Sequence, residues 1–256
     1  MRILISNDDG ILAPGIAALH AAVADMGEIS VVAPHGPQSA SAHAITLRTP
    51  MAVGHVELAE FSGISVDGRP ADCVRLAIRE LLDHRPDIVL TGINDSSNVG
   101  VNLFYSGTVA AAAEAAMMGI PAIAFSAASR DRCPDFLEAA KLCRKVLDQL
   151  LKTEMAPGDL TNVNIPDLKI HRRPKGVSVV HQSEGRIHDN YIRQIGPDGR
   201  ETWQLSDNYS YGPHHHEDSD VGCLREGDIT ITPLRIDLTR DDKLAELSQI
   251  DWSGVK

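Results

Sequence analysis

Short apolar runs alternate with amphipathic stretches through residue 165. The apolar runs have the length and composition of buried strands, and they lie at residues 2–6, 29–33, 87–90, 122–125 and 163–165. The amphipathic stretches predict helices, and they lie at residues 14–26, 70–82, 108–118 and 135–151. Weaker extended segments are expected at 45–47, 51–53 and 64–66. The alternation predicts an α/β fold with a mostly parallel sheet and helices on both faces.

The pattern changes in the last third of the chain. Residues 176–212 predict paired extended segments joined by a turn at Pro197-Asp-Gly199. This stretch is too polar for a core, so we expect an extended arm that needs a partner surface, for example by exchange between protomers. A last strand at 228–232 and a short helix at 241–248 complete one predicted domain over residues 1–256.

Composition narrows the classes of function. The net charge of −11 argues against binding to nucleic-acid backbones, and 4% aromatic residues argue against stacking on single strands. The most apolar long region, residues 107–129, is interrupted by Glu114 and Pro121, so we expect no membrane span. No apolar leader precedes Ile3, and the four cysteines lack a Cys-x-x-Cys pair, so we expect a cytoplasmic protein with reduced thiols.

Polar side chains follow three of the predicted strands at the end where parallel sheets bind ligands. Asp8 and Asp9 follow the first strand and precede a turn at Gly10, Ser39 follows the second, and Asn94 follows the strand at 87–90. Two carboxylates, a hydroxyl and an amide oxygen suit one hard cation, Mg²⁺, Mn²⁺ or Ca²⁺. A solvated Asp-Asp-Gly turn without any ligand is the alternative for Asp8 and Asp9.

A second polar motif, Tyr105-Ser-Gly-Thr-Val109, begins the alanine-rich helix. Ser106, Gly107 and Thr108 expose unpaired N–H groups at a helix start, where a phosphate can bind. Helix capping alone explains Ser106 or Thr108 equally well. No Walker loop and no dinucleotide glycine fingerprint is present in the sequence.

Histidines suggest only weak alternatives. The run His214-His-His216 invites a transition-metal reading, but adjacent histidines rarely converge on one ion, so a polar loop is preferred. His43 lies close enough to Ser39 in sequence to line the same site.

The motifs together resemble the SurE (survival protein E) family of metal-dependent 5′/3′-nucleotidases over most of the chain. The resemblance rests on Ile5-Ser-Asn-Asp-Asp-Gly10, Ala33-Pro-x₄-Ser39, Asp72-Cys-Val74, Gly92-Ile-Asn94 with Asn98, Tyr105-Ser-Gly-Thr-Val109, Asn162-Val-Asn-Ile-Pro-Asp167, and Ser219-Asp220…Gly227…Ile231-Thr-Pro-Leu234. It implies a Rossmann-like core, an arm exchanged in a homodimer or tetramer, and hydrolysis of nucleoside monophosphates. One divalent cation per subunit would be bound by Asp8, Asp9, Ser39 and Asn94, and Asn98 would join the phosphate-binding residues.

The chain departs from the usual family pattern at three places. Ala40 stands where glycine usually follows the metal-binding serine, Asp95-Ser-Ser97 replaces a glycine-bearing loop, and Gly227-Asp228 replaces a Gly-Tyr pair. These departures bear on loop geometry and substrate preference more than on the chemistry.

The sequence therefore predicts a metal-dependent phosphomonoesterase in which Asp9 accepts a proton from the attacking water. Two alternatives remain. Asp8 could instead act as a covalent nucleophile, or the chain could be a noncatalytic nucleotide- or metal-sensing module.

Overall fold

The computed structural model describes the chain from residue 1 to 255 except residues 60, 186, 207–209 and 212–216. Its strands are β1 Arg2–Ser6, β2 Glu28–Pro34, β3 Val53–Glu57, β4 Ser62–Val66, β5 Ile88–Asn94, β6 Ala122–Ala127, β7 Leu160–Ile165, β8 Val177–Val179, β9 Ile187–His188, β10 Tyr191–Ile195, β11 Glu201–Leu205, β12 Ser210–Tyr211 and β13 Ile229–Leu234. Its α-helices are α1 Pro14–Val23, α2 Pro70–Leu76, α3 Gly107–Met117, α4 Phe136–Leu150, α5 Asp220–Glu226 and α6 Asp241–Leu247.

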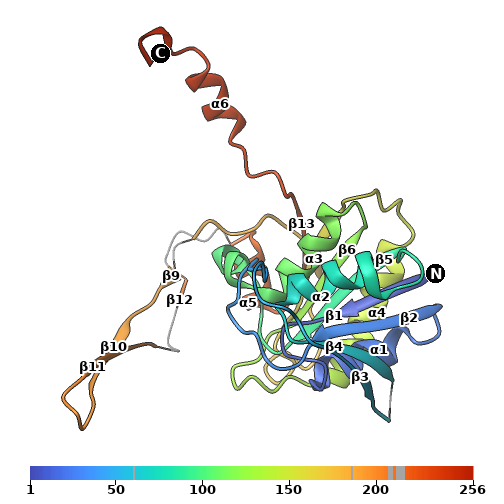
Figure 1. Cartoon of the computed structure of the whole chain (residues 1–256). Helices are drawn as coiled ribbons and strands as arrows, with labels where there is room; N and C mark the ends of the chain where they lie inside the picture. The colour runs from blue at the N-terminus through green and yellow to red at the C-terminus, as the bar shows by residue number, and fades with distance from the viewer. Residues whose placement is uncertain (60, 186, 207–209, 212–216, 256) are drawn as a thin grey trace.

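A sheet with the strand order β3-β4-β2-β1-β5-β6-β7-β13-β8 forms the centre of the described structure (Figure 1). β1 lies between β2 and β5 and pairs parallel with both, with Ile5 opposite Val31 and Leu90. Among the described strand pairs of this sheet, only β3–β4 and β7–β13 are antiparallel. The predicted mostly parallel α/β sheet is therefore confirmed.

Helices cover both faces of the sheet because successive strand residues point to opposite sides. Ile3 and Ile5 of β1 belong to the core formed with α1 and α4, whereas Leu4 belongs to the core formed with α2 and α3. β1 is buried on both faces, which explains its unbroken apolar sequence. As a result the side chains that follow β1 emerge at an edge enclosed by elements from both layers.

The local predictions differ from the structure at several boundaries. α1 ends at Val23 instead of residue 26, and residues 77–81 continue α2 as a π-helical turn. No strand is present at 45–47, where the chain is tied to α2 by Asp72, and β3 begins at Val53 instead of residue 51. The helix α5 was not predicted, since seven residues carry too little periodicity to be recognised.

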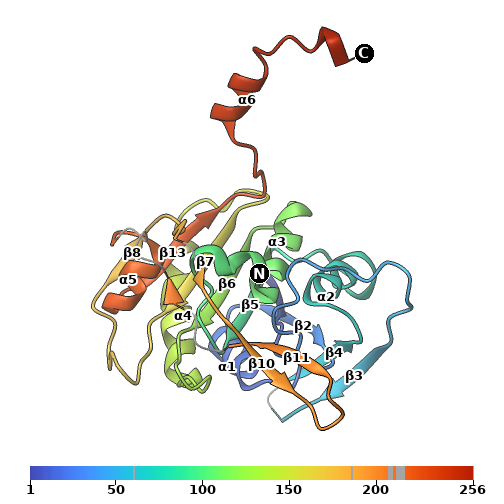
Figure 2. The same cartoon turned by 90° about the vertical axis from the view of Figure 1, so that its left-hand side faces the viewer.

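The predicted arm contains the expected hairpin, but one part of it belongs elsewhere. β10 and β11 pair antiparallel around a turn in which the Arg200 carbonyl accepts a hydrogen bond from the Gly196 N–H at 2.8 Å. β8, in contrast, joins the main sheet beside β13. The hairpin and the C-terminal segment with α6 project from the body in different directions (Figures 1 and 2). Within the described residues, no helix has the length and apolarity needed to cross a lipid bilayer.

Candidate active site

The turn after β1 places both aspartates at the carboxyl edge of the sheet. Asn7 closes this turn, because its side chain donates to the Gly10 carbonyl at 2.9 Å and accepts from the Gly10 N–H at 3.2 Å. Gly10 has φ +98°, a conformation that favours glycine. The Asp8 carbonyl accepts from the Gln38 N–H at 2.7 Å, so the turn also holds the loop that carries Ser39.

Asp8 is buried against the start of α3. Its carboxylate accepts hydrogen bonds from both the hydroxyl and the backbone N–H of Thr108. The Thr91 hydroxyl of β5 donates to the Thr108 carbonyl at 2.8 Å and fixes this helix start to the sheet. Burial nevertheless raises the pKa of Asp8 above its ordinary value, and the nearby negative charge of Asp95 adds to the rise.

Gly107 gives Asp8 the space it occupies. A Cβ atom at position 107 would lie 2.7 Å from Asp8 Cβ and 2.9 Å from Asp8 Oδ2. Such distances are too short for a side chain without displacing Asp8. Glycine is therefore required here by close packing on a carboxylate.

Asp9 lies next to the end of β5. Its carboxylate accepts from the backbone N–H of Asp95, and burial raises its pKa to about 7, with further contributions from the negative charges of Asp8 and Asp95. Arg132 opposes this rise only in part. Two neighbouring carboxylates with raised pKa values and hard oxygen atoms fit a divalent cation, which would compensate the charge that burial leaves uncompensated.

A cavity of about 770 Å³ joins most of the predicted site residues. It is lined by Asp8, Ser39, Asn94, Asn98 and Ser106, together with residues of the β10–β11 arm. Asp9, Gly107 and Thr108 do not line it, but each contacts a residue that does or flanks one in the chain. The structure therefore brings three strand ends and the start of α3 to one place, as the order of the motifs predicted.

The start of α3 has fewer open donors than the sequence suggested. The Thr108 N–H is taken by Asp8, and the Val109 N–H donates to Ser106 Oγ at 3.1 Å. Ser106 therefore caps the helix, while its own hydroxyl hydrogen stays available to an oxygen in the cavity. The Gly107 N–H and the Ser106 hydroxyl are the donors that remain for a phosphate.

Two motifs singled out in the sequence hold loops in place. Asn98 is fixed by β7, because Asn164 Oδ1 accepts from its N–H at 2.8 Å, and the Asn98 carbonyl accepts from the side chains of Asn162 and Asn164 at 2.8 and 3.0 Å. Asp72 accepts from the N–H and hydroxyl of Thr46, which steadies the loop after β2. Asn98 therefore lines the cavity from a position fixed by β7, whereas Asp72 supports the neighbouring loop without lining the cavity.

The remaining histidine and cysteine alternatives do not produce a second centre in the described structure. His43 Nε2 bonds Glu114 at 2.9 Å and lies in a neighbouring apolar pocket instead of the cavity with Asp8. The run His214–His216 lies outside the described residues. Among those described, no three His, Cys, Asp or Glu side chains group as metal ligands, and Cys73, Cys133, Cys143 and Cys223 are free.

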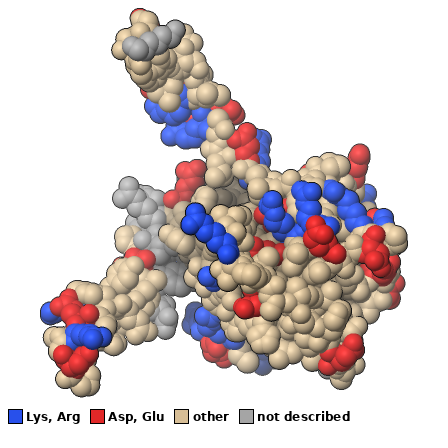
Figure 3. Space-filling view, viewed as in Figure 1, with Lys and Arg blue, Asp and Glu red and all other residues tan. Residues whose placement is uncertain are grey.

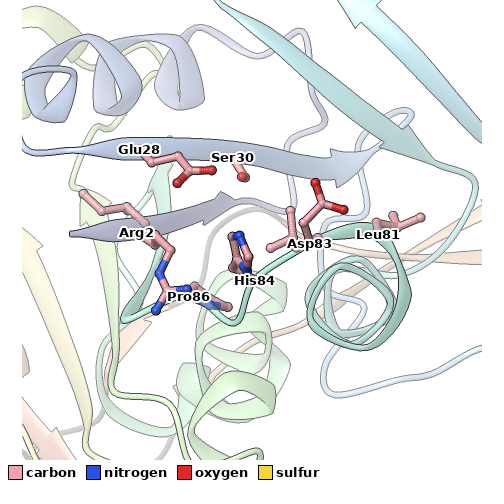
Figure 4. Close-up of a pocket in the computed structure, with 9 residues that line it drawn as sticks. Arg2, Glu28, Ser30, Leu81, Asp83, His84 and Pro86 are labelled. Carbon is pink, nitrogen blue, oxygen red and sulfur yellow. The ribbon is translucent and has the colours of Figure 1, made fainter.

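A smaller cavity of about 230 Å³ lies at the opposite edge of the sheet (Figure 4). Glu28 and Ser30 of β2 face Asp83 and His84 across it, and Arg2 lies at its side, where it is bonded to Asp87 (Figure 4). None of the predicted site residues lines this cavity. This smaller cavity is therefore separate from the predicted site at the carboxyl edge.

Sequence reasoning missed Arg132, which follows β6 and lines the larger cavity. Arg132 follows a fourth parallel strand, and polar residues after parallel strands are expected to lie at the ligand-binding edge of the sheet. The same rule identified Asp8, Ser39 and Asn94. The loop from 128 to 134 carries no sequence motif of its own.

The chain is similar in sequence and structure to known proteins. A family model described as survival protein SurE matches residues 3–189. The chain is 41% identical over 97% of its length to 5′-nucleotidase SurE 1 of Thermus thermophilus, which it covers to 97%. It is 39% identical over 99% of its length to 5′-nucleotidase SurE of Desulforudis audaxviator, which it covers completely (100%).

A solved structure supports the same relationship. The SurE protein of Aquifex aeolicus superposes with a TM-score of 0.82 at 35% sequence identity, covering 97% of this chain and 98% of that one. With a family model over residues 3–189 and full-length relatives near 40% identity, the chain belongs to the survival protein SurE family.

Proposed function

We propose that this chain is a divalent-cation-dependent phosphomonoesterase that hydrolyses nucleoside 5′-monophosphates, with 3′-monophosphates as a second substrate class. The observation that carries the proposal is the pair of adjacent carboxylates with raised pKa values, buried Asp8 and half-buried Asp9, close to the start of α3. The relatives named 5′-nucleotidase support the choice of substrate.

The cation site would consist of Asp8, Asp9, Ser39 and Asn94, with Mg²⁺ or Mn²⁺ as the expected ion and Ca²⁺ as a further candidate. When bound, the cation would polarise a phosphoryl oxygen and lower the pKa of a water molecule. The Asn94 side chain is held in one orientation, because its amide nitrogen donates to the carbonyl and hydroxyl oxygens of Ser96. Its Oδ1 points away from Ser96 and would be the atom that contacts the cation. The carboxylates supply the negative charge that the cation needs.

The chain's own groups would then handle the phosphate and the proton. The Ser106 hydroxyl and the Gly107 N–H would donate to phosphoryl oxygens, with the dipole of α3 adding positive potential. The Asn98 side chain lines the same cavity beside them. Asp9, with a pKa raised to about 7 by burial, is the group best suited to accept a proton from the attacking water.

A covalent mechanism through Asp8 is disfavoured by its contacts. Thr108 already donates two hydrogen bonds to that carboxylate, and the proposed cation would take a further oxygen contact. Direct attack by water leaves these contacts in place. Isolation of a phosphorylated aspartate after rapid quenching would establish the covalent route instead.

Phosphate release from AMP tests the proposed activity. We expect turnover with Mn²⁺ or Mg²⁺, loss of turnover with a chelator, and recovery after the cation is restored; 3′-AMP serves as the second substrate. Nucleotide binding without phosphate release, with every divalent cation tried, would reject the enzyme in favour of a sensing module.

Cation binding should depend on pH. Because burial raises the pKa of Asp8 and Asp9, the cation-free protein loses stability as the pH rises from the ordinary aspartate value of 3.8 to about 7. A cation competes with the proton, so Mn²⁺ affinity should increase between pH 6 and pH 8 by up to roughly tenfold per unit for each proton displaced. Calorimetry in two buffers with different ionisation enthalpies measures both affinity and proton release, and a constant affinity without proton release would contradict this expectation.

We further propose that the arm packs on another protomer, giving a homodimer or tetramer. In the single chain Ile192, Ile195 and Trp203 are about half exposed or more, which is costly for an isolated hairpin. On the face of the body drawn in Figure 3, Lys and Arg side chains lie mainly across the upper part, with Asp and Glu side chains among and below them. Apolar contact between copies is the favoured arrangement.

Light scattering coupled to size exclusion tests this assembly at micromolar protein. The wild-type chain should elute as a dimer or tetramer, and the double variant Ile195→Glu/Trp203→Glu should shift to a smaller species. Leu137→Glu is the matched control, since Leu137 is 72% exposed on α4 and lies outside the arm. A wild-type monomer would overturn the proposal.

A further inference from the structure

Arg132 lies in a loop that holds it in one conformation at the cavity. It follows β6 and has φ +53°, which costs an ordinary residue roughly 1 kcal/mol or more. Asp131 keeps the loop closed, because its carboxylate accepts from Ser129 Oγ at 2.7 Å and from Lys169 Nζ at 2.6 Å. Residues held in such backbone conformations concentrate at functional sites.

One carboxylate orients the guanidinium of Arg132 by bonding one edge of it, and the other edge remains available. Its Nε and Nη2 donate to Asp95 Oδ2 and Oδ1 at 3.1 and 3.0 Å, a two-bond contact along one edge of the fork. In the described structure no acceptor is bonded to Nη1. The side chain is 60% exposed and lines the cavity, so its other edge is open to a ligand.

The charges around the cavity make this arginine distinctive. Among the described residues that line the cavity, Arg132 is the cationic one, whereas Asp8, Glu184 and Asp189 are acidic. Asp9 and Asp8 both raise the pKa of Arg132, after the larger effect of Asp95, which places its charge near the proposed cation site. A doubly charged phosphate needs such a positive group at an otherwise acidic opening.

We propose that Arg132, oriented by Asp95, is a phosphate-recognising side chain that contacts the phosphoryl oxygens of the substrate through its open Nη1 edge. The proposal rests on the proposed function for the identity of that substrate. It assigns a binding role to the Asp95-Ser-Ser97 loop, which departs from the usual glycine-bearing sequence of the family. If the Asp95–Arg132 pair served only to join two loops, its loss would change stability and leave ligand binding unaltered.

A phosphate-binding role and a purely structural role of Arg132 predict different changes in the affinities for phosphate and for Mn²⁺. Arg132→Gln should weaken the binding of inorganic phosphate to the Mn²⁺-loaded protein by about 10- to 100-fold, the range for losing a hydrogen bond to a charged group. The same variant should bind Mn²⁺ more tightly in the absence of phosphate, by roughly a few fold, because a positive charge near Asp8 and Asp9 is removed. A purely structural loss would weaken both ligands or neither.

Two further variants complete the experiment. Arg132→Lys keeps the charge and loses the fork, so it should leave Mn²⁺ affinity close to wild type and bind phosphate with intermediate affinity. Arg144→Gln is the matched control, since Arg144 is likewise an arginine paired with carboxylates, those of Asp25 and Asp148, but lies on α4 away from the cavity. It should change neither affinity.

Calorimetry with MnCl₂ and with inorganic phosphate gives both binding constants, and steady-state kinetics with AMP should show a raised KM that follows the phosphate affinity. Unchanged phosphate affinity in Arg132→Gln would overturn the proposal even if AMP is hydrolysed normally. Failure of the wild type to hydrolyse AMP would reject the proposed function, while the calorimetric comparison would still decide whether Arg132 binds phosphate.

Discussion

Replacing Asp8 or Asp9 with asparagine should lower turnover of AMP by on the order of 100-fold or more. Each substitution removes a charged oxygen ligand from the proposed cation site, and a bound metal contributes several kcal/mol of transition-state stabilisation. The fold should persist, because burial raises the pKa of both groups and the ionised carboxylates therefore destabilise the cation-free protein at neutral pH. The melting temperature of each cation-free variant at pH 8 should equal or exceed that of wild type.

Asp87→Asn is the matched control for these two substitutions. Asp87 precedes β5 at the opposite edge of the sheet, where it accepts from the Arg2 N–H at 2.7 Å. Its replacement should leave the kinetic constants unchanged and lower stability slightly at most, since exposed ion pairs contribute little. Near-normal turnover of both Asp8→Asn and Asp9→Asn at saturating Mn²⁺ would reject the cation assignment.

Adding one carbon at Gly107 should have the second-largest effect. In Gly107→Ala the new Cβ would lie 2.7 Å from Asp8 Cβ and 2.9 Å from Asp8 Oδ2, so Asp8 must move. A displacement of about 1 Å in a catalytic constellation can reduce rates on the order of 100-fold. We therefore expect kcat/KM for AMP to fall by that order and Mn²⁺ affinity to fall with it.

If Gly107 only starts the helix, Gly107→Ala should change neither activity nor Mn²⁺ affinity. Alanine favours the helix over glycine, so the variant would then be at least as stable and fully active. Gly176→Ala serves as the control, because its Cβ would meet only an ordinary contact at 3.5 Å and it lies outside the site. Kinetics, Mn²⁺ calorimetry and melting temperature, measured for both variants, separate the two interpretations.

The core of the fold and most of the site could be predicted because the relevant signals are local. β1 reads as an apolar run that ends in Asp8 and Asp9, and the parallel arrangement follows from alternating strands and helices. Polar residues after such strands then converge by geometry alone, as Ser39 and Asn94 do at the cavity.

The features that escaped prediction depend on contacts between distant segments. The segment at 45–47 is apolar enough for a strand, but the Thr46 N–H bonds Asp72 at 2.9 Å and no neighbouring strand pairs with it. The sequence suggested that the Thr108 and Val109 N–H groups were free to bind a phosphate. In the structure they donate hydrogen bonds to the Asp8 carboxylate and to Ser106 Oγ. The bond between Asp95 and Arg132 spans 37 residues and has no sequence signature.

The cation site itself is tested most directly by anomalous diffraction at the manganese edge from crystals of this chain grown with MnCl₂. We expect one anomalous peak per subunit at the carboxyl edge of the sheet, within coordination distance, about 2.1–2.3 Å, of oxygen atoms from Asp8, Asp9, Ser39 and Asn94. An ordered active-site turn without a peak at saturating Mn²⁺, or a peak bound only by other residues, would contradict it.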